Sequence, residues 1–537
     1  MTTGVEGDSD TKSQIGTKGE GIVVRVKGEH QVLTQVDLLD DTDRFNQLVF
    51  EKEWLLHPKD AEGLVLKGNL FVVEETHSQK GVVFVKRAPL PHARDYLVGE
   101  ADMTVKALPG SEGYEFMLHL TGPEELESWE VLRYENGEHG RRSALHTWQQ
   151  SLRPSSVEHL EPRFISNTWG DRNRDACINH DFILKEIESG ARLGVDVIQI
   201  DDGWQKGRTA NSSEAKEKGG VWIGFWAADP DFWVPDPVRF PKGLEPLVKK
   251  AEEKGMQIGL WYAPDSHEEF SNWKRDADQI IKLHNRYRVS HFKLDSILTE
   301  TILARKNLRS MMEAIGRESR GRVVCDLDIT AGVRPGYFAE MTLGPLFLEN
   351  RYTDWHNYWP HFTLRNLWQL SQYVDPRRLR MEFLNNTRNI EKYKGDHLAP
   401  KYYSPATLFA ITMFSNPLGW FECSGLTDSF IEDVARIVRV WKEHRSELFG
   451  GTIRPVGLAP NGHHWTGFLS LGKGGGTGYL LVFNEKASAP SYEFDLSETF
   501  DSVEVLSGEG AGRVSGNSVV VELDQSFGYL FMRLSKS

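Results

Sequence analysis

Two strand-like segments of the sequence end in residues that could carry out chemistry. Residues 195–204 read VDVIQIDDGW, an apolar run followed by two adjacent aspartates, a glycine and a tryptophan. Residues 288–297 read RVSHFKLDSI, a second run that leads into Lys293 and Asp295. Because side chains alternate along a strand, Lys293 and Asp295 point to the same face. The ammonium group would keep the neighbouring carboxylate ionised, which is the state required of a nucleophile that attacks a sugar.

Further carboxylates follow the later predicted strands, at Asp265, Asp326, Asp328, Glu349 and Asp354. Many isolated aspartates in such places are helix N-caps. Asp201 and Asp202 fit a cap less well, because the glycine and tryptophan that follow do not begin a helical pattern. Two acids side by side are better explained by binding of ligand hydroxyls or of a cation. For Lys293 and Asp295 the structural alternative is an ion pair inside a barrel.

Strands that alternate with helices must position these acids. Continuous apolar runs are typical of parallel strands with both faces covered. Eight such runs are predicted, at 163–169, 195–202, 257–265, 290–296, 322–329, 343–351, 378–384 and 408–415. Helical segments such as 181–194 and 362–374 lie between them. This pattern predicts a (β/α)8 TIM barrel, whose active site forms at the C-terminal strand ends. A doubly wound sheet is the alternative.

The barrel is expected to occupy residues 162–447, between two β-domains. Short β-type runs predict an N-terminal β-sandwich at 22–140, followed by a helical linker at 141–161. The strand pattern returns in a small C-terminal β-domain at 448–537. Residues 1–21 are rich in Gly, Ser, Thr and charge, and are predicted to be disordered. The predicted fold class is therefore α/β, a TIM barrel flanked by a β-sandwich and a small β-domain.

The composition argues against several classes of protein. A net charge of −14 without a long basic stripe argues against a nucleic-acid partner. Cys177, Cys325 and Cys423 make neither a disulfide framework nor a CxxC zinc pair. No apolar stretch reaches membrane-spanning length, and the N-terminus has no signal-peptide core. We therefore expect a cytoplasmic protein with no metal, no cofactor and no membrane partner.

Four short motifs in the barrel occur in a recognisable order: NTW at 167–169, DDGW at 201–204, GLWYAPD at 259–265 and KLD at 293–295. The series resembles the motifs of the family 36 glycoside hydrolases, the α-galactosidase or melibiase group, which is related to families 27 and 31. The resemblance covers mainly the barrel, and more loosely the β-domains on either side. It implies a retaining hydrolase that removes terminal α-linked galactose, or a related hexose, from oligosaccharides or glycosides.

The resemblance also implies roles for matching residues. Asp201 and Asp202 would bind the distal hydroxyls of the terminal sugar. Lys293 would bind further hydroxyls, and Asp295 would attack the anomeric carbon. Three tryptophans would line or support the pocket, namely Trp169, Trp204 and Trp261.

The predicted fifth strand departs from the family pattern. In relatives a cysteine near the second carbon of the sugar is followed by a glycine cluster and an arginine. Here Cys325 matches the cysteine, but it is followed by DLDITAGVR. Arg334 is therefore only an approximate match, and the pocket around the 2-substituent is expected to differ.

The predicted sixth strand departs further. The acid/base motif of the family is close to Ser-Asp-x-Thr-Asp, whereas this chain reads LENRYTDW at 348–355. Before the shared Thr-Asp pair this chain has Asn350 and Arg351 in place of an acid, and both are expected to contact substrate. Asp354, or else Glu349, would then donate the proton, unless either is a helix cap or an ion-pair partner of Arg351.

Other functions remain open on the sequence. A raffinose-synthase-like α-galactosyl transglycosylase shares the motifs, and an α-N-acetylgalactosaminidase would suit the altered fifth strand. A Mg²⁺-dependent enolase-type lyase could use Asp265, Asp295 and Asp328 as ligands, although Lys293 stands beside them. A catalytically dead sugar-binding protein is favoured if the sixth strand has lost its acid. A homo-oligomer is compatible with the sequence.

Overall fold

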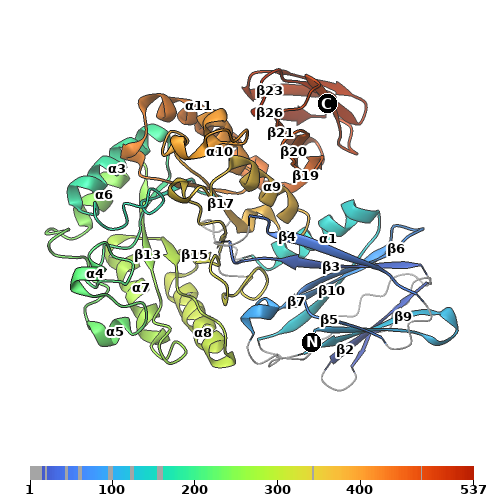
Figure 1. Ribbon diagram of the computed structural model, residues 1–537, viewed down its shortest axis with the longest axis horizontal. Helices are drawn as coiled ribbons and strands as arrows, with labels where there is room; N and C mark the ends of the chain where they lie inside the picture. Colours follow the sequence, from blue (N-terminus) through green and yellow to red (C-terminus); the bar gives the residue numbers. More distant parts are fainter. Residues whose placement is uncertain are drawn as a thin grey trace.

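The computed structural model describes residues 15–17, 21–28, 30–42, 46–57, 63–94, 101–120, 126–153, 161–341, 344–472 and 474–536. An N-terminal sandwich, a closed barrel and C-terminal sheets follow one another along the chain (Figure 1). This architecture confirms the predicted α/β fold class. The domain limits themselves stay predictions. Of the segment predicted to be disordered, 1–21, the structure describes Gly21 and a short strand, β1 (Ile15–Thr17), and the rest lies outside the described residues.

Two antiparallel sheets form the N-terminal sandwich. One sheet has the order β1-β2-β9-β8-β5 and the other β10-β7-β6-β3-β4. Their remaining strands are β2 (Gly21–Lys27), β3 (Gln31–Leu38), β4 (Val49–Leu55), β5 (Leu64–Leu66), β6 (Leu70–Glu75), β7 (Gly81–Arg87), β8 (Met103–Ala107), β9 (Gly113–His119) and β10 (Ser128–Tyr134). Leu33, Phe84 and Phe116 are fully buried in the core between the sheets. Helix α1 (Gly137–Ser151) then leads towards the barrel.

Parallel strands close into the barrel that carries the predicted site. They are β11 (Ile165–Asn167), β12 (Val197–Ile200), β13 (Gln257–Tyr262), β14 (His291–Leu294), β15 (Val324–Asp328), β16 (Leu346–Phe347), β17 (Leu379–Phe383) and β18 (Asn416–Trp420). β11 pairs with both β12 and β18, which closes the sheet on itself. The first seven predicted runs each contain one of these strands.

The eighth predicted strand, 408–415, is wrong. These residues lie mostly in helix α10 (Pro405–Thr412), and the eighth strand is β18. The Ser404 hydroxyl accepts the Thr407 N–H as an N-cap, and Pro405 occupies the first helical turn. All residues of this helix after Pro405 are buried. Its apolar run therefore has no helical period and resembles the run of a buried strand.

Helices cover the outside of the barrel (Figure 1). The longer ones are α3 (His180–Leu193), α6 (Glu245–Glu253), α7 (Trp273–Tyr287), α8 (Ile302–Ser319), α9 (Pro360–Leu370), α10 and α11 (Asp428–Gly450), and α4 (Ala215–Lys218) and α5 (Phe225–Ala228) are short. The predicted helices at 181–194 and 362–374 correspond to α3 and α9. Asn179 caps α3 by accepting the Phe182 N–H, and Gly194 ends it with a positive φ of 91°. No described helix has both the length and the apolar character needed to cross a bilayer.

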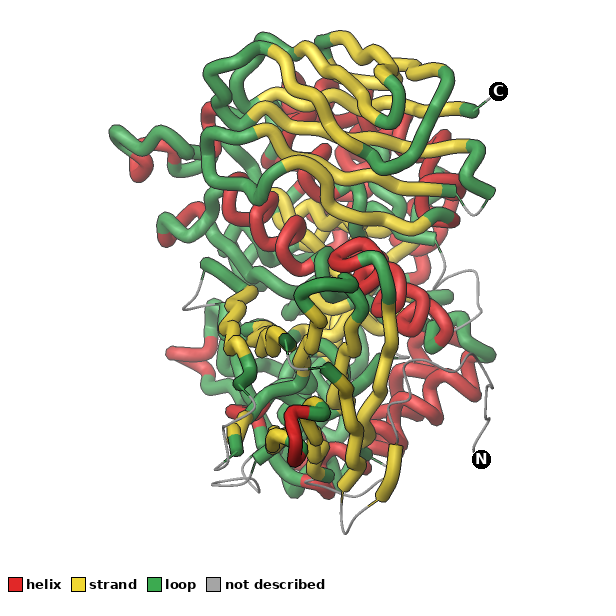
Figure 2. The backbone as a smooth tube through the Cα atoms, turned by 90° about the vertical axis from the view of Figure 1, so that its right-hand side faces the viewer, coloured by secondary structure: helices red, strands yellow, loops and turns green. Residues whose placement is uncertain are grey.

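Two further sheets follow α11. One has the order β19-β20-β21-β26-β23 and the other β22-β25-β24. Their strands are β19 (Thr452–Gly457), β20 (Trp465–Leu471), β21 (Thr477–Asn484), β22 (Ser491–Asp495), β23 (Ser502–Gly508), β24 (Ala511–Ser515), β25 (Ser518–Glu522) and β26 (Gly528–Ser535). They run across the top of the view in Figure 2.

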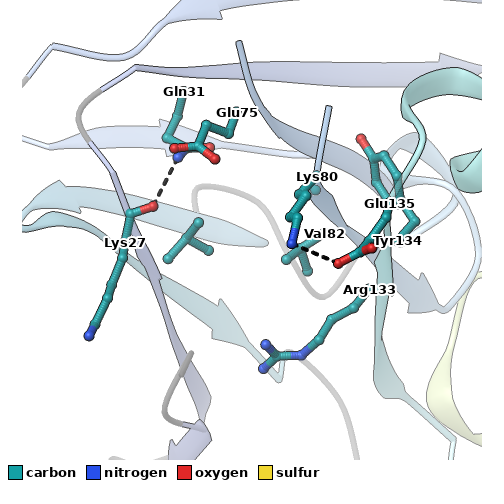
Figure 3. Close-up of a pocket in the computed structure, with 10 residues that line it drawn as sticks. Lys27, Gln31, Glu75, Lys80, Val82, Arg133, Tyr134 and Glu135 are labelled. Carbon is teal, nitrogen blue, oxygen red and sulfur yellow. Dashed lines mark hydrogen bonds and ion pairs between the residues drawn. The ribbon is translucent and has the colours of Figure 1, made fainter. Parts of the chain in front are cut away.

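A charged hollow lies in the N-terminal sandwich (Figure 3). The Lys80 ammonium lies 2.9 Å from the Glu135 carboxylate, and the Gln31 amide donates to the Lys27 carbonyl at 3.0 Å. Its lining belongs to the sandwich and to the residues that join its strands, and it includes none of the predicted site residues. The chemistry must be sought in the barrel.

Candidate active site

A polar pocket opens at the C-terminal ends of the barrel strands, where TIM barrels build their active sites. It has a cavity volume of about 80 Å³. Its lining residues are Trp169, Asp201, Asp202, Asn211, Trp222, Trp261, Lys293, Asp295, Asp328, Asn350 and Tyr352. Seven of the predicted site residues are therefore brought together here: Trp169, Asp201, Asp202, Trp261, Lys293, Asp295 and Asn350.

Asp295 follows β14 directly, and its side chain is 16% exposed. Its Oδ1 accepts hydrogen bonds from both terminal nitrogens of Arg334 at 3.2 Å and from the Ser296 N–H at 2.6 Å. Its Oδ2 accepts the Trp261 indole N–H at 3.3 Å. Burial raises the pKa of Asp295, but the charges of Arg334 and Lys293 outweigh burial, so the net pKa lies below the ordinary value. Asp295 is thus an ionised carboxylate at the pocket.

Lys293 lies deeper, between two other pocket carboxylates. Its Nζ is 3.4 Å from Asp201 Oδ2 and 3.6 Å from Asp328 Oδ2. The ammonium also lies 4.9 Å from the ring centroids of Phe347 and Trp420. Burial lowers the pKa of Lys293, but the surrounding aspartates more than offset it, and the net pKa is above the ordinary value. The side chain is therefore a fixed positive charge at the base of the site.

Asp201 and Asp202 follow β12 and are held in place by several donors. Asp201 Oδ2 accepts from the Asn167 amide at 2.8 Å. Asp202 accepts from the Gln205 amide at 2.6 Å and from the Thr209 hydroxyl. Burial raises the pKa of Asp202 to about 7, although these two hydrogen bonds oppose the shift. Fixed carboxylates of this kind are suited to accept hydrogen bonds from the hydroxyls of a sugar.

The three predicted tryptophans have different positions. Trp169 and Trp261 line the pocket. Trp204 is fully buried and packs on Trp233 with 6.2 Å between ring centroids. Its indole N–H donates to the Trp261 carbonyl at 2.8 Å, so it supports the pocket wall from behind.

The structure does not bring Cys325 to the pocket. Side chains alternate along β15, and the Asp326 carboxylate faces into the barrel, where it lies 2.8 Å from Arg380. Cys325 therefore faces outward, where it is buried in the main hydrophobic core. The residue of β15 that does reach the pocket is Asp328. Burial and the neighbouring charge of Asp295 raise the pKa of Asp328.

Neither predicted proton donor lines the pocket. Glu349 is buried behind it and accepts hydrogen bonds at 2.8 Å from Thr363 and Asn366, both on α9. Asp354 lies in a 3₁₀ helix, η4 (Thr353–Trp355), and accepts from the Asn389 amide at 2.6 Å. Both carboxylates therefore have structural partners.

Asn350 lines the pocket with a left-handed backbone, at a φ of 51°. The Tyr352 hydroxyl donates to Asn350 Oδ1 at 2.7 Å, and the Asn350 N–H donates to Glu382 at 3.2 Å. Arg351 turns away, and its guanidinium donates to the Thr42 carbonyl of the sandwich. Of this predicted pair, only Asn350 is placed where it can contact a ligand.

Four lining residues were not predicted as site residues from the sequence, namely Asn211, Trp222, Asp328 and Tyr352. Asn211 and Trp222 belong to the long connection between β12 and β13, which also contains α4 and α5. A connection of that length in a barrel is itself a functional signal. Tyr352 has no comparable signal in the sequence.

Comparison with known proteins finds a family match for part of the chain. Residues 131–306 match the family model described as Melibiase. The α-galactosidase of Escherichia coli is 31% identical over 119 residues, which make up 22% of this chain and 13% of that protein. The α-galactosidase AgaA of Geobacillus stearothermophilus is 23% identical over 189 residues, 34% of this chain and 24% of AgaA. The aligned segments thus cover only a small part of both relatives.

The likeness in fold extends over almost the whole chain. The crystal structure of the GH36 α-galactosidase AgaA from Geobacillus stearothermophilus superposes with a TM-score of 0.66 at 14% identity, covering 96% of this chain and 76% of AgaA. The α-galactosidase from Lactobacillus brevis gives 0.63 at 11% identity, covering 97% and 77%. The segment 131–306 matches the Melibiase family model, and the resemblance to the family 36 glycoside hydrolases is confirmed.

Proposed function

We propose that this protein is a retaining glycoside hydrolase that removes terminal α-linked galactose. The observation that carries the proposal is the ionised carboxylate of Asp295, which lines a polar pocket next to the buried ammonium of Lys293. The relatives named as α-galactosidases support the choice of sugar and linkage.

In the proposed first step Asp295 attacks the anomeric carbon and the bond to the leaving oxygen breaks, which gives a glycosyl-enzyme. Water then attacks the same carbon and releases Asp295, so two inversions give net retention. Asp201 and Asp202 accept hydrogen bonds from hydroxyls far from the reacting carbon. Arg334 and the Trp261 indole hold the attacking carboxylate in place.

Replacement of the nucleophile tests this mechanism. We expect Asp295→Ala to abolish turnover of a nitrophenyl α-galactoside. A 2-deoxy-2-fluoro galactosyl donor with an activated leaving group should label the wild-type peptide that contains Asp295, as read by mass spectrometry. Asp231→Ala, a change at an exposed carboxylate of the β12–β13 connection, is the matched control and should retain activity. Near-normal activity in Asp295→Ala would remove the proposal.

Oligosaccharides are one class of substrate to be tested. AgaA variants have been solved in complex with stachyose and with raffinose. A raffinose-synthase-like transglycosylase would use the same first step but transfer galactose to an acceptor sugar. Product analysis with added sucrose distinguishes the two activities. A parallel assay with an aryl α-N-acetylgalactosaminide tests whether the enzyme is instead an α-N-acetylgalactosaminidase.

The enolase-type lyase requires a metal ion. Across the described ranges, no three His, Cys, Asp or Glu side chains are grouped so that they could hold one. Asp328 instead lies 3.6 Å from the Lys293 ammonium, and Asp295 accepts hydrogen bonds from Arg334. We expect activity to persist in EDTA. A sugar-binding protein without activity would bind galactosides but fail both the turnover and the labelling assays.

A further inference from the structure

The pocket carboxylates other than Asp295 are engaged in ways that do not suit a proton donor. Asp201 and Asp328 lie on either side of the Lys293 ammonium, at 3.4 and 3.6 Å. Asp202 accepts hydrogen bonds at both of its oxygens, from Gln205 and Thr209.

Asp328 is also on the wrong side for this role. It ends β15, which pairs directly with β14, so it stands beside Asp295 in the barrel wall. In a retaining displacement the acid and the nucleophile flank the scissile bond from two sides. A carboxyl group next to the nucleophile is better placed to contact the sugar than the departing oxygen.

The loop after β16, two strands along the barrel from β14, contributes an amide side chain to the pocket. Asn350 lines it, whereas Glu349 binds Thr363 and Asn366 behind it. The hydrogen bonds from Tyr352 to the Asn350 side chain and from the Asn350 N–H to Glu382 fix this residue. An amide N–H can donate a hydrogen bond to a leaving oxygen but cannot transfer its proton at neutral pH.

We propose that the leaving-group side of this pocket has the Asn350 amide in place of a carboxylic acid, and that the enzyme cleaves α-galactosides whose leaving group departs as a stable anion. Phenolates, phosphates and carboxylates are leaving groups of this class. This inference rests on the proposed function, because it requires Asp295 as the nucleophile.

The balance of the reaction follows from this arrangement. A bond forms between Asp295 and the anomeric carbon while the bond to the leaving oxygen breaks, and the electron pair departs with that oxygen as an anion. The water that attacks in the second step loses its proton to solvent. Because no general base assists that water, an added anion such as azide should compete with it and yield the α-galactosyl azide.

The first test uses the wild-type protein. We expect kcat/KM to fall steeply along a series of aryl α-galactosides as the phenol becomes less acidic, with melibiose cleaved far more slowly than the dinitrophenyl substrate. Azide should accelerate turnover of the dinitrophenyl substrate, and nuclear magnetic resonance should identify the product as the α-azide. A β-azide would mean that Asp295 had not reacted first and would overturn the proposal.

The second test restores the missing acid. Asn350→Asp should raise kcat/KM for melibiose by at least about tenfold, since general acid catalysis contributes about 10² to 10⁴ in rate. It should also remove the azide effect. Asp tolerates the left-handed backbone, and Tyr352 can still donate to its carboxylate. Asn357→Asp is the matched control, because Asn357 Oδ1 only accepts the Tyr352 N–H, which an aspartate also can do.

Efficient cleavage of melibiose by the wild type, with no azide product, would overturn the inference and show that another group such as Asp328 donates the proton. Failure of Asn350→Asp to gain activity on melibiose, while the Asn357→Asp control behaves as wild type, would also overturn it. These results differ from failure of the proposed function, in which even the dinitrophenyl substrate is not cleaved and no fluorosugar label reaches Asp295.

Discussion

The carboxylate of Asp202 lines the pocket and has a pKa near neutral pH. Burial raises its pKa from 3.8 to about 7. Protonation removes acceptor capacity that sugar hydroxyls need, so kcat/KM for a nitrophenyl α-galactoside should fall about tenfold per pH unit below about 7. Asp202→Asn should have lower activity but a flat profile there. The measurement is kcat/KM between pH 5 and 8.

The control for this profile is Asp276→Asn. Burial also raises the pKa of Asp276 to about 7, but its carboxylate accepts from Tyr262 and Trp226 and does not line the pocket. The fall in kcat/KM at acidic pH should persist in this variant.

The pH dependence of stability should have the opposite sign to that of activity. Because the folded protein holds these two protons more tightly than the unfolded chain, the contribution of Asp202 and Asp276 to stability should decrease as pH rises from about 4 to about 7.

Asp328, and not the predicted Cys325, is the β15 residue that lines the pocket. Cys325 is buried outside the barrel wall, so we expect Cys325→Ala to cost about 1 kcal/mol of stability and to leave KM unchanged. Asp328→Asn removes a charge from the pocket next to Lys293 and should lower kcat/KM by tenfold or more. Steady-state kinetics of the two variants check this. A large rise in KM for Cys325→Ala alone would contradict the placement of the two side chains.

These residues show how far the sequence predicts the site. The two-residue alternation correctly placed Lys293 and Asp295 on one face, because both belong to a regular strand and its end. The same rule, applied to β15, shows that Cys325 and Asp328 point to opposite faces, but the family motif pointed to the cysteine. Tyr352 and Asn211 reach the pocket from connections whose paths depend on tertiary packing, which no local pattern encodes.

At the scale of elements, the N-terminal sandwich helps to hold the loop after β15. The Thr42 N–H donates to the Thr330 carbonyl at 3.1 Å, and the Tyr337 hydroxyl donates to the Leu39 carbonyl at 2.7 Å. Arg351, next to Asn350, donates to the Thr42 carbonyl. The loops that carry Arg334 and Asn350 are therefore both tied to one segment of the sandwich, which helps to keep the site in position.

Glu349 joins the loop after β16 to α9, and its removal should affect folding more than chemistry. Glu349→Ala leaves the buried donors of Thr363 and Asn366 unsatisfied, at a cost of about 1–3 kcal/mol for each group. Asp354→Ala, in the more exposed η4, should cost much less. Thermal melting measures both effects.

The same two variants report on proton donation. Neither carboxylate lines the pocket, so we expect any loss of kcat to be similar for substrates with good and poor leaving groups. A loss confined to the poor leaving group would identify that residue as the acid, and it would contradict the placement of Asn350 at the leaving oxygen.

The elements themselves were predicted with uneven success, for physical reasons. β12 lies between Asp196 and Asp201, and β14 lies between Ser290 and Asp295, so these two apolar runs end where the strands end. α10 is buried on all sides and has no polar face to reveal its helical period, which is why it was mistaken for a strand. β16 is only two residues long, and most of its predicted run is loop.

At the scale of the whole molecule, the main hydrophobic core crosses the predicted domain limits. It includes Val36, Leu38 and Leu48 of the sandwich, the helices and strands of the barrel, and Phe468 and Phe531 of the C-terminal sheets. Separate clusters lie inside the sandwich and inside the C-terminal domain. The sandwich therefore contributes to two cores, its own and the one that it shares with the barrel.

Two leucines of the sandwich allow the shared core to be tested. Leu48 and Leu118 are both fully buried, but Leu48 belongs to the shared core and donates its N–H to Asn366 on α9, whereas Leu118 belongs to the core of the sandwich. Replacement of either by alanine should cost about 2–5 kcal/mol. We expect Leu48→Ala to lower the temperature of half-inactivation more than Leu118→Ala does, because only Leu48 supports the loop that carries the pocket amide. Equal shifts in enzymatic half-inactivation would mean that sandwich and barrel unfold as a single unit.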